Sequence, residues 1–203
     1  MLAVISTPTF SVSGVDVVST QQAGIYDVQV VTANDAQPLI LWLNNHEFQF
    51  TDSDRDVFND YLAAGWSFAV ARVRPNIRVV GEERIVEGLV APLILRFATE
   101  QPVYPMALTG TVGRETEVLL YIFGEHKTAG DGRLEMQAAL ESGSNNIAQY
   151  LETDPQEFFG EVEKSLGYIT KFKGKLTPEQ MRQDLMFSVA SDDKAFRKHV
   201  VMF

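Results

Sequence analysis

The sequence predicts an α+β fold in which a largely antiparallel sheet carries an inserted helical pair on one face and is followed by a helical C-terminal segment. Several short runs alternate apolar and polar residues, as half-buried strands do. Two helical patterns, at residues 35–46 and 54–64, separate two of these runs. We expect residues 1–143 to form the α+β domain and residues 144–203 to form a helical extension packed on it or on a partner.

Composition excludes several classes of protein. The chain has 203 residues, of which 45% are hydrophobic, and this suits one domain, or one domain with a small appendage. It has no cysteine, so disulfides and thiolate metal sites are excluded. The net charge of −10 argues against a nucleic-acid partner and against adhesion to an anionic membrane surface. No apolar run approaches the length of a membrane span, and the first residues lack the features of a signal peptide.

The first strands are expected at Val15–Thr20 and Tyr26–Thr32, with a turn at Gln21–Gly24. The second run alternates in character, which predicts one buried and one exposed face. The predicted buried side chains are Tyr26, Val28 and Val30, and the predicted exposed ones are Asp27 and Gln29.

The first helix is expected over residues 35–46. Asn34 suits its N-cap, and Gln37 stands three residues later, where a capping box places its partner. The apolar face of this helix is predicted to comprise Leu39, Ile40, Trp42 and Leu43.

The second helix is expected over residues 54–64, with Asp52 or Ser53 as its cap. Gly65 stands where a helix C-terminus favours glycine, and a strand is predicted to follow at Trp66–Arg74. The apolar side chains of this helix are Val57, Phe58, Tyr61 and Leu62.

Further strands are predicted downstream. Residues 76–88 are charged and contain two glycines, so we expect a hairpin or loop there, followed by a strand over 89–99. Two more strands, Val103–Thr111 and Glu117–Phe123, are expected to form a hairpin around a turn at Gly113.

The pattern becomes more helical after Gly124. We expect a loop at Thr128–Gly132 and then helices. Asp154 followed by Pro155 is typical of a helix start, and the same signal recurs at Thr177-Pro178. The stripe predicted to be buried by the first of these helices is Phe158, Phe159, Val162 and Leu166.

One group of carboxylates qualifies as a candidate metal site. Asp52, Asp54 and Asp56 have the alternate spacing of a calcium-binding loop. Val57 stands where that loop needs glycine, and Ala63 where it needs glutamate. Carboxylates at a helix N-terminus also interact favourably with its dipole. Helix capping is therefore the favoured interpretation, with a weak cation site as the alternative.

The three histidines do not form a recognisable site in sequence. His46 lacks the second histidine four residues on that a helical zinc site requires. His126 and His199 stand in charged or terminal segments, and a solvent-exposed side chain is favoured for each of the three histidines. A convergence of His46 with His126 in three dimensions stays open. No nucleophile elbow, phosphate loop or dinucleotide fingerprint is present, so we predict no catalytic residue and no cofactor.

Five segments of the sequence carry a resemblance to a known family. They are the turn Gly24–Asp27, the helix Asn34–Leu43, the run Tyr61–Phe68, the segment Pro92–Phe97 with Pro102–Pro105, and the stretch from Tyr168 to Leu185. In these segments the chain resembles a bacterial family of unknown function, the DUF2330 family.

Members of that family usually begin with an export signal and a cysteine-containing segment ahead of the first of these turns. The resemblance therefore implies that this chain corresponds to the C-terminal half of a longer exported protein. It implies a periplasmic or cell-surface location, with any membrane contact made indirectly through parts absent here. The family has no assigned activity, so it supplies no catalytic residue.

Two functions follow as hypotheses. The favoured one is a non-catalytic extracytoplasmic domain that serves as an accessory, scaffold or partner-binding subunit of a larger assembly, with a protein as its partner. The alternative is a cation-dependent hydrolase that uses Asp52, Asp54 and His46 near the loop between the two helices.

Overall fold

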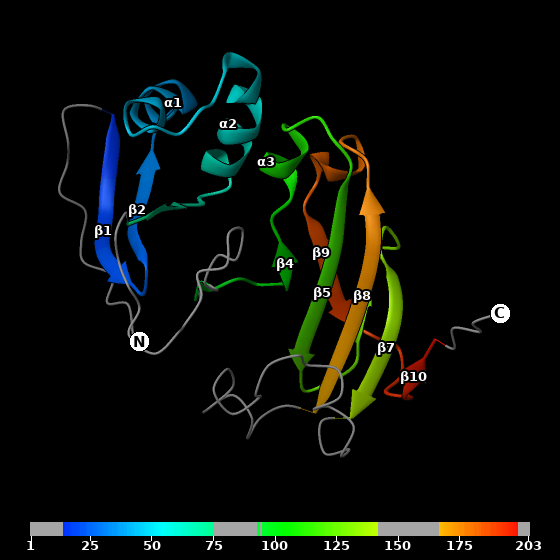
Figure 1. The fold of residues 1–203 in the computed structure, drawn as a ribbon. Coiled ribbons are helices and arrows are strands. Elements are labelled where there is room, and N and C mark those ends of the chain that lie inside the picture. The colour runs from blue at the N-terminus through cyan, green and yellow to red at the C-terminus, as the bar shows by residue number, and fades with distance from the viewer. Residues whose placement is uncertain (1–13, 75–92, 94, 142–166, 199–203) are drawn as a thin grey trace. The chain divides into compact units, whose positions relative to one another are not determined.

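The fold is known from a computed structural model, in which the chain forms two compact units, residues 1–97 and 98–203 (Figure 1). The first contains a three-stranded sheet and two helices, and the second contains two sheets. All strand pairs are antiparallel in the part of the chain that the structure describes, which confirms the predicted α+β class. The structure describes residues 14–74, 93, 95–141 and 167–198.

The sheet of the first unit has the order β1-β2-β3. Strands β1 (Val15–Ala23) and β2 (Tyr26–Ala33) form a hairpin that closes on the pair Ala23↔Tyr26. The turn therefore lies at Gly24 and Ile25, and the prediction of a turn at Gln21–Gly24 was wrong. Gly24 has a φ of +55°, which glycine adopts without strain, so the chain reverses there rather than earlier.

Burial in β2 follows the predicted alternation from Tyr26 to Gln29 but not beyond, because Val30 is half-buried and Val31 is 0% exposed. Tyr26 and Val28 are 7% and 1% exposed, whereas Asp27 and Gln29 are half-buried. Strand β3 (Phe68–Val73) pairs along the other edge of β2. The expectation of a strand near Trp66–Arg74 is confirmed.

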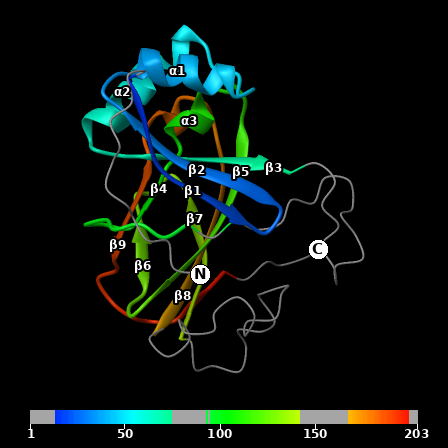
Figure 2. The same cartoon turned by 90° about the vertical axis from the view of Figure 1, so that its left-hand side faces the viewer.

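Helices α1 (Ala36–Asn45) and α2 (Arg55–Ala63) are inserted between β2 and β3 and lie on the same side of the sheet (Figure 2). Helix α2 contributes Phe58, whose ring lies 5.2 Å from the ring of Phe68 on β3. Phe58 is 1% exposed, so this contact is part of the hydrophobic core of the unit.

The cap of α1 differs from the prediction by one residue. Asp35, not Asn34, has the extended backbone of an N-cap, and its carboxylate accepts a 2.7 Å hydrogen bond from the amide of Gln37. The side chain of Gln37 accepts instead from Arg55 at the start of α2. Asn34 precedes the cap because β2 continues to Ala33.

The second unit contains two sheets, with orders β10-β7-β8-β5 and β4-β9-β6. The larger sheet consists of β5 (Thr116–Gly124), β7 (Glu135–Glu141), β8 (Tyr168–Leu176) and β10 (Phe196–Arg197). The smaller consists of β4 (Val103–Tyr104), β6 (Thr128–Gly130) and β9 (Leu185–Val189).

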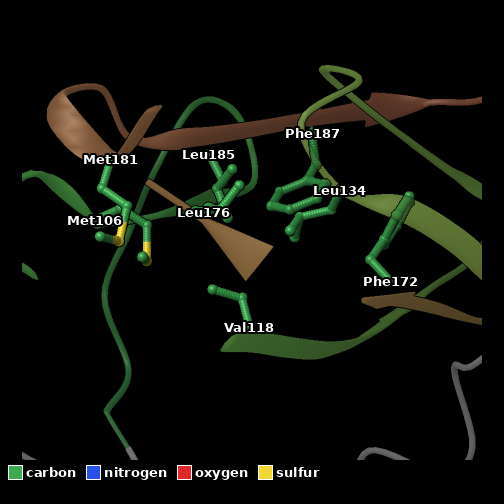
Figure 3. Close-up of a cluster of buried hydrophobic side chains, with 8 residues drawn as sticks. All are labelled: Met106, Val118, Leu134, Phe172, Leu176, Met181, Leu185 and Phe187. Atoms are coloured by element: carbon green, nitrogen blue, oxygen red, sulfur yellow. The ribbon is translucent and has the colours of Figure 1, made fainter. Parts of the chain in front are cut away.

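A hydrophobic core fills the space between the two sheets of this unit (Figure 3). Strand β8 contributes Phe172 and Leu176 from one sheet, and β9 contributes Leu185 and Phe187 from the other. The buried members are completed by Met106, Val118, Leu134 and Met181. The core of this unit therefore lies between two packed sheets. Along their strands, inward-facing apolar residues alternate with outward-facing ones.

The predicted strand Val103–Thr111 was wrong beyond Tyr104. A short helix, α3 (Ala107–Gly110), follows β4. Asp184 is the cause, because its carboxylate accepts hydrogen bonds from the amides of Met106 and Ala107 at the start of this helix. Strand β4 consequently pairs with β9, and the predicted hairpin around Gly113 with β5 does not form.

Two other expectations need correction. The loop predicted at Thr128–Gly132 contains β6, which pairs with β9. The strand predicted over 89–99 has no regular structure at residues 93 and 95–99, and the rest of it lies outside the described residues. Residues 76–88 also lie outside them.

The helical C-terminal segment is not found where the chain after residue 166 is described. Residues 167–198 instead supply β8, β9 and β10, and the start signal at Thr177-Pro178 leads only to a 3₁₀ turn, η4 (Gln180–Arg182). The helix stops because Leu185 and Phe187 alternate into the core, a period of two that fits only a strand. The expected boundary at residues 143 and 144 falls between β7 and β8, which pair in one sheet. The predicted helix start at Asp154-Pro155 lies outside the described residues.

A buried hydrogen bond between the two sheets yields a first prediction. The amide of Thr128 on β6 donates at 3.0 Å to the hydroxyl of Thr170 on β8, and Thr170 is 0% exposed. Thr170→Val keeps the shape of the side chain but leaves the Thr128 amide without its acceptor, so we expect a loss of about 1–3 kcal/mol in the free energy of unfolding.

Urea denaturation measures this loss, and Thr170→Ser is the matched control because it retains the hydroxyl. We expect the serine variant to be more stable than the valine variant. Equal stability of the two variants would show that the hydrogen bond contributes little.

Candidate functional site

The loop between α1 and α2 contains the predicted carboxylates. Residues Asp52–Asp54 form a 3₁₀ turn, η1, directly before α2. The carboxylate of Asp54 accepts from the amide of Thr51 at 2.8 Å and from the hydroxyl of Thr51 at 3.1 Å. Asp54 is only 7% exposed. The capping box at the start of this helical segment is thus built on Thr51 and Asp54, not on Asp52 or Ser53.

The other two carboxylates of the predicted site have separate surroundings. Asp52 is exposed and pairs with the guanidinium of Arg55 at 3.0 Å. Asp56 is exposed in the first turn of α2, where a negative charge interacts favourably with the helix dipole. Within the described residues, no three or more His, Asp or Glu side chains are placed so that they could hold a metal ion.

His46 lies at the end of α1 and contacts that helix. Its ring stacks on the indole of Trp42 with centroids 3.8 Å apart, and its Nδ1 lies 2.7 Å from the carbonyl oxygen of Trp42. A carbonyl oxygen only accepts, so Nδ1 carries the proton and Nε2 is the acceptor nitrogen of the neutral ring. The two rings are therefore fixed relative to each other.

The chain reverses direction directly after His46. The amide of Phe48 donates to the carbonyl of Leu43 at 3.0 Å, which closes α1 in a Schellman arrangement. Glu47 occupies its left-handed position with a φ of +70°, where glycine is the usual residue. Arg72 on β3 donates to the carbonyl of His46 and lies 3.5 Å from the carboxylate of Glu47. This end of α1 is consequently fastened to the sheet.

Helix α1 presents a second face away from the core. Its buried side chains include Leu39, Ile40 and Leu43, which face inward. Leu41 is 55% exposed, and Trp42 beside it is half-buried under the ring of His46. We call the exposed Leu41 and the stack of Trp42 and His46, which begins roughly 100° further around the helix, the α1 outer face. Sequence analysis placed Trp42 in the core with Leu43, because the amphipathic pattern of this helix is apolar on both sides.

The predicted hydrolase residues thus have different partners. His46 is hydrogen bonded to Trp42, Asp54 to Thr51, and Asp52 to Arg55. The other described histidine, His126, belongs to the second unit and lies 2.9 Å from Asp193. That contact joins residues 67 positions apart, and no local motif marks it in the sequence.

The match to a family model covers residues 5–188, and the chain belongs to the DUF2330 family, uncharacterized proteins conserved in bacteria. No curated protein and no solved structure matches it. Among the described residues, no helix is both long and apolar enough to cross a membrane.

The capping role of Asp54 yields a second prediction. Asp54→Ala removes the acceptor of the Thr51 amide, so we expect it to lower the free energy of unfolding by about 1–2 kcal/mol. Asp56→Ala removes an exposed carboxylate from the same helix and is expected to cost less, about 0.3–1 kcal/mol. Chemical denaturation of both variants measures the difference. Equal losses would contradict the assignment of Asp54 as the cap.

Proposed function

We propose that this chain is a non-catalytic domain that acts outside the cytoplasm as an accessory, scaffold or partner-binding subunit, and that it binds a protein through the α1 outer face. Two observations carry the proposal: Leu41 is 55% exposed, and the next residue, Trp42, is stacked on His46. Tryptophan is enriched among the residues that dominate binding energy at protein interfaces.

The rigidity of this face supports the same proposal. The hydrogen bond between His46 and the Trp42 carbonyl orients one ring on the other, and Arg72 holds the end of the helix. Side chains that are already ordered lose little conformational entropy when a partner binds. A partner that offers apolar side chains to Leu41 and the edge of Trp42 fits this surface.

The backbone of Glu47, next to this face, has an unfavourable conformation with a φ of +70°. A side chain other than glycine in the left-handed region is disfavoured by roughly 1–2 kcal/mol. Its carboxylate is exposed and lies near Arg72, so the ion pair returns little of that free energy. Strained backbone positions of this kind occur often at functional sites. The location outside the cytoplasm rests on the family resemblance alone.

Replacement of Leu41 tests the proposed interface. We expect Leu41→Asp to abolish a cross-linked complex of the full chain in envelope fractions of its native bacterium, because a charge would be buried against an apolar partner surface. Immunoblotting of the tagged chain after cross-linking in cells is the measurement. Val112→Asp is the matched control, since Val112 is 61% exposed in the second unit.

Three outcomes would overturn the proposal. One is a chain that runs at its own mass after cross-linking, and another is a complex that Leu41→Asp leaves intact. A chain found in the cytoplasmic fraction would contradict the location.

The alternative, a cation-dependent hydrolase, predicts that a metal ion binds near Asp52 and Asp54 and raises the melting midpoint. Asp54 already accepts two hydrogen bonds from Thr51, so a cation would have to displace them. We expect the melting midpoint to stay unchanged in roughly millimolar calcium or zinc, because only a ligand that binds the native state raises it. Differential scanning calorimetry measures the midpoint. A rise that Asp52→Asn abolishes would favour the hydrolase.

A further inference from the structure

A cluster of charged side chains in the second unit joins two segments that are far apart in sequence. Residues 125–127 connect β5 to β6, and residues 190–195 connect β9 to β10. The amide of Ala190 donates to the carbonyl of Lys127 at 2.8 Å. The side chains between these segments add a second layer of contacts.

Asp193 is at the centre of this cluster. One carboxylate oxygen accepts from Nδ1 of His126 at 2.9 Å, and the other accepts from the amide of Lys127 at 2.9 Å. Its backbone carbonyl accepts from the hydroxyl of Tyr168 on β8 at 2.7 Å. Asp193 is therefore hydrogen bonded both to the loop between β5 and β6 and to strand β8.

Lys127 completes the connection. Its ammonium donates to the carboxylate of Asp192 at 3.0 Å and to the carbonyl of Lys194 at 3.1 Å. The Lys127 side chain is only 14% exposed, whereas the side chain of Asp192 is 46% exposed.

We propose that these two segments form a pH-sensitive clasp, which holds β10 against β7 while His126 is protonated and loosens when His126 loses its proton. Strand β10 follows the clasp directly and pairs with β7 through Phe196↔Ala139. The amide of Lys198 extends that pairing to the carbonyl of Gln137 at 2.9 Å.

The proton on His126 strengthens its hydrogen bond because both partners are then charged. Hydrogen bonding to Asp193, and then the charge of that carboxylate, raise the pKa of His126 above its usual value. The contribution of this group to stability is therefore complete below its unfolded pKa and is lost as the pH rises through the folded pKa. Loss of the proton leaves a neutral hydrogen bond, so the clasp weakens without losing every contact.

The carboxylates set the acidic limit of the same effect. The hydrogen bond from His126, and then that from the Lys127 amide, lower the pKa of Asp193. The hydrogen bond from Lys127 likewise lowers the pKa of Asp192. Their contribution is present above the unfolded pKa and is lost as the pH falls through the folded pKa. The clasp is accordingly strongest in the mildly acidic range between the carboxylates and the imidazole.

Several other ionisable groups surround His126. They are Glu125 and Lys127 on its own segment, Asp192 and Lys194 on the facing loop, and Tyr168 with Glu141 at the ends of β8 and β7. Desolvation, and then the charges of Glu141 and Asp193, raise the pKa of Tyr168. Its hydroxyl thus keeps its proton near neutrality, and His126 is the group whose charge changes there.

Two measurements on the full chain test the clasp. A titration of the histidine ring protons by NMR is expected to give a pKa for His126 above about 6.5, falling toward that value in Asp193→Asn. Hydrogen exchange at Lys198, corrected for the intrinsic rate, is expected to be roughly twofold to fivefold more protected at about pH 5.5 than at about pH 8.5. His126→Gln should abolish that difference, and His46→Gln is the control that should retain it.

An ordinary pKa for His126 in the wild-type chain would overturn the proposal, and this result needs no variant to fold. Protection at Lys198 that is the same at both pH values, or that changes equally in His126→Gln, would also contradict it. An effect that disappears in His46→Gln would place the switch elsewhere.

Discussion

The hydrogen bond between Thr128 and Thr170 lies where the two sheets of the second unit meet. It joins β6 of the smaller sheet to β8 of the larger one at a fully buried hydroxyl. Buried polar groups are costly without a partner, so this contact disfavours a slip of either strand. Phe172, two residues along β8, is thereby directed into the core together with Phe187 of β9. The register of β8 therefore determines which of its side chains enter the core and how it pairs with β5 and β7.

Several acidic side chains accept hydrogen bonds from backbone amides. Asp54 accepts from the amide of Thr51, Asp184 from the amides that begin α3, and Asp193 from the amide of Lys127. Each takes the place of a main-chain acceptor at a point where regular structure begins or a loop closes. A carboxylate in a short acidic run thus carries little information about metal binding, because the same spacing suits a helix start.

Most helices and strands in residues 14–74 followed from the sequence because their signals are local, although the turn after β1 and the cap of α1 did not. The alternation in β2 and the glycine after α2 specify their elements within a few residues. The second unit depends on contacts across long separations, such as Asp184 with Met106 and Thr170 with Thr128. The helix signal at Thr177-Pro178 produces only a short 3₁₀ turn, because the burial of Leu185 and Phe187 favours a strand directly after it. Tertiary contacts here override local helix propensity. The pair of His126 and Asp193 was hidden for the same reason.

The proposed location gives the proposed clasp a physical setting. A protein outside the cytoplasm is exposed to changes in the external pH. A histidine with a raised pKa, such as His126, changes its charge near neutral pH. The α1 outer face contains His46, whose Nδ1 stays bonded to the Trp42 carbonyl in either charge state, because it is the donor in both. The clasp of the second unit instead couples a proton directly to the attachment of β10. The two proposed features therefore differ: the binding face depends on a hydrogen bond to a backbone carbonyl, whereas the clasp depends on a charged pair next to β10.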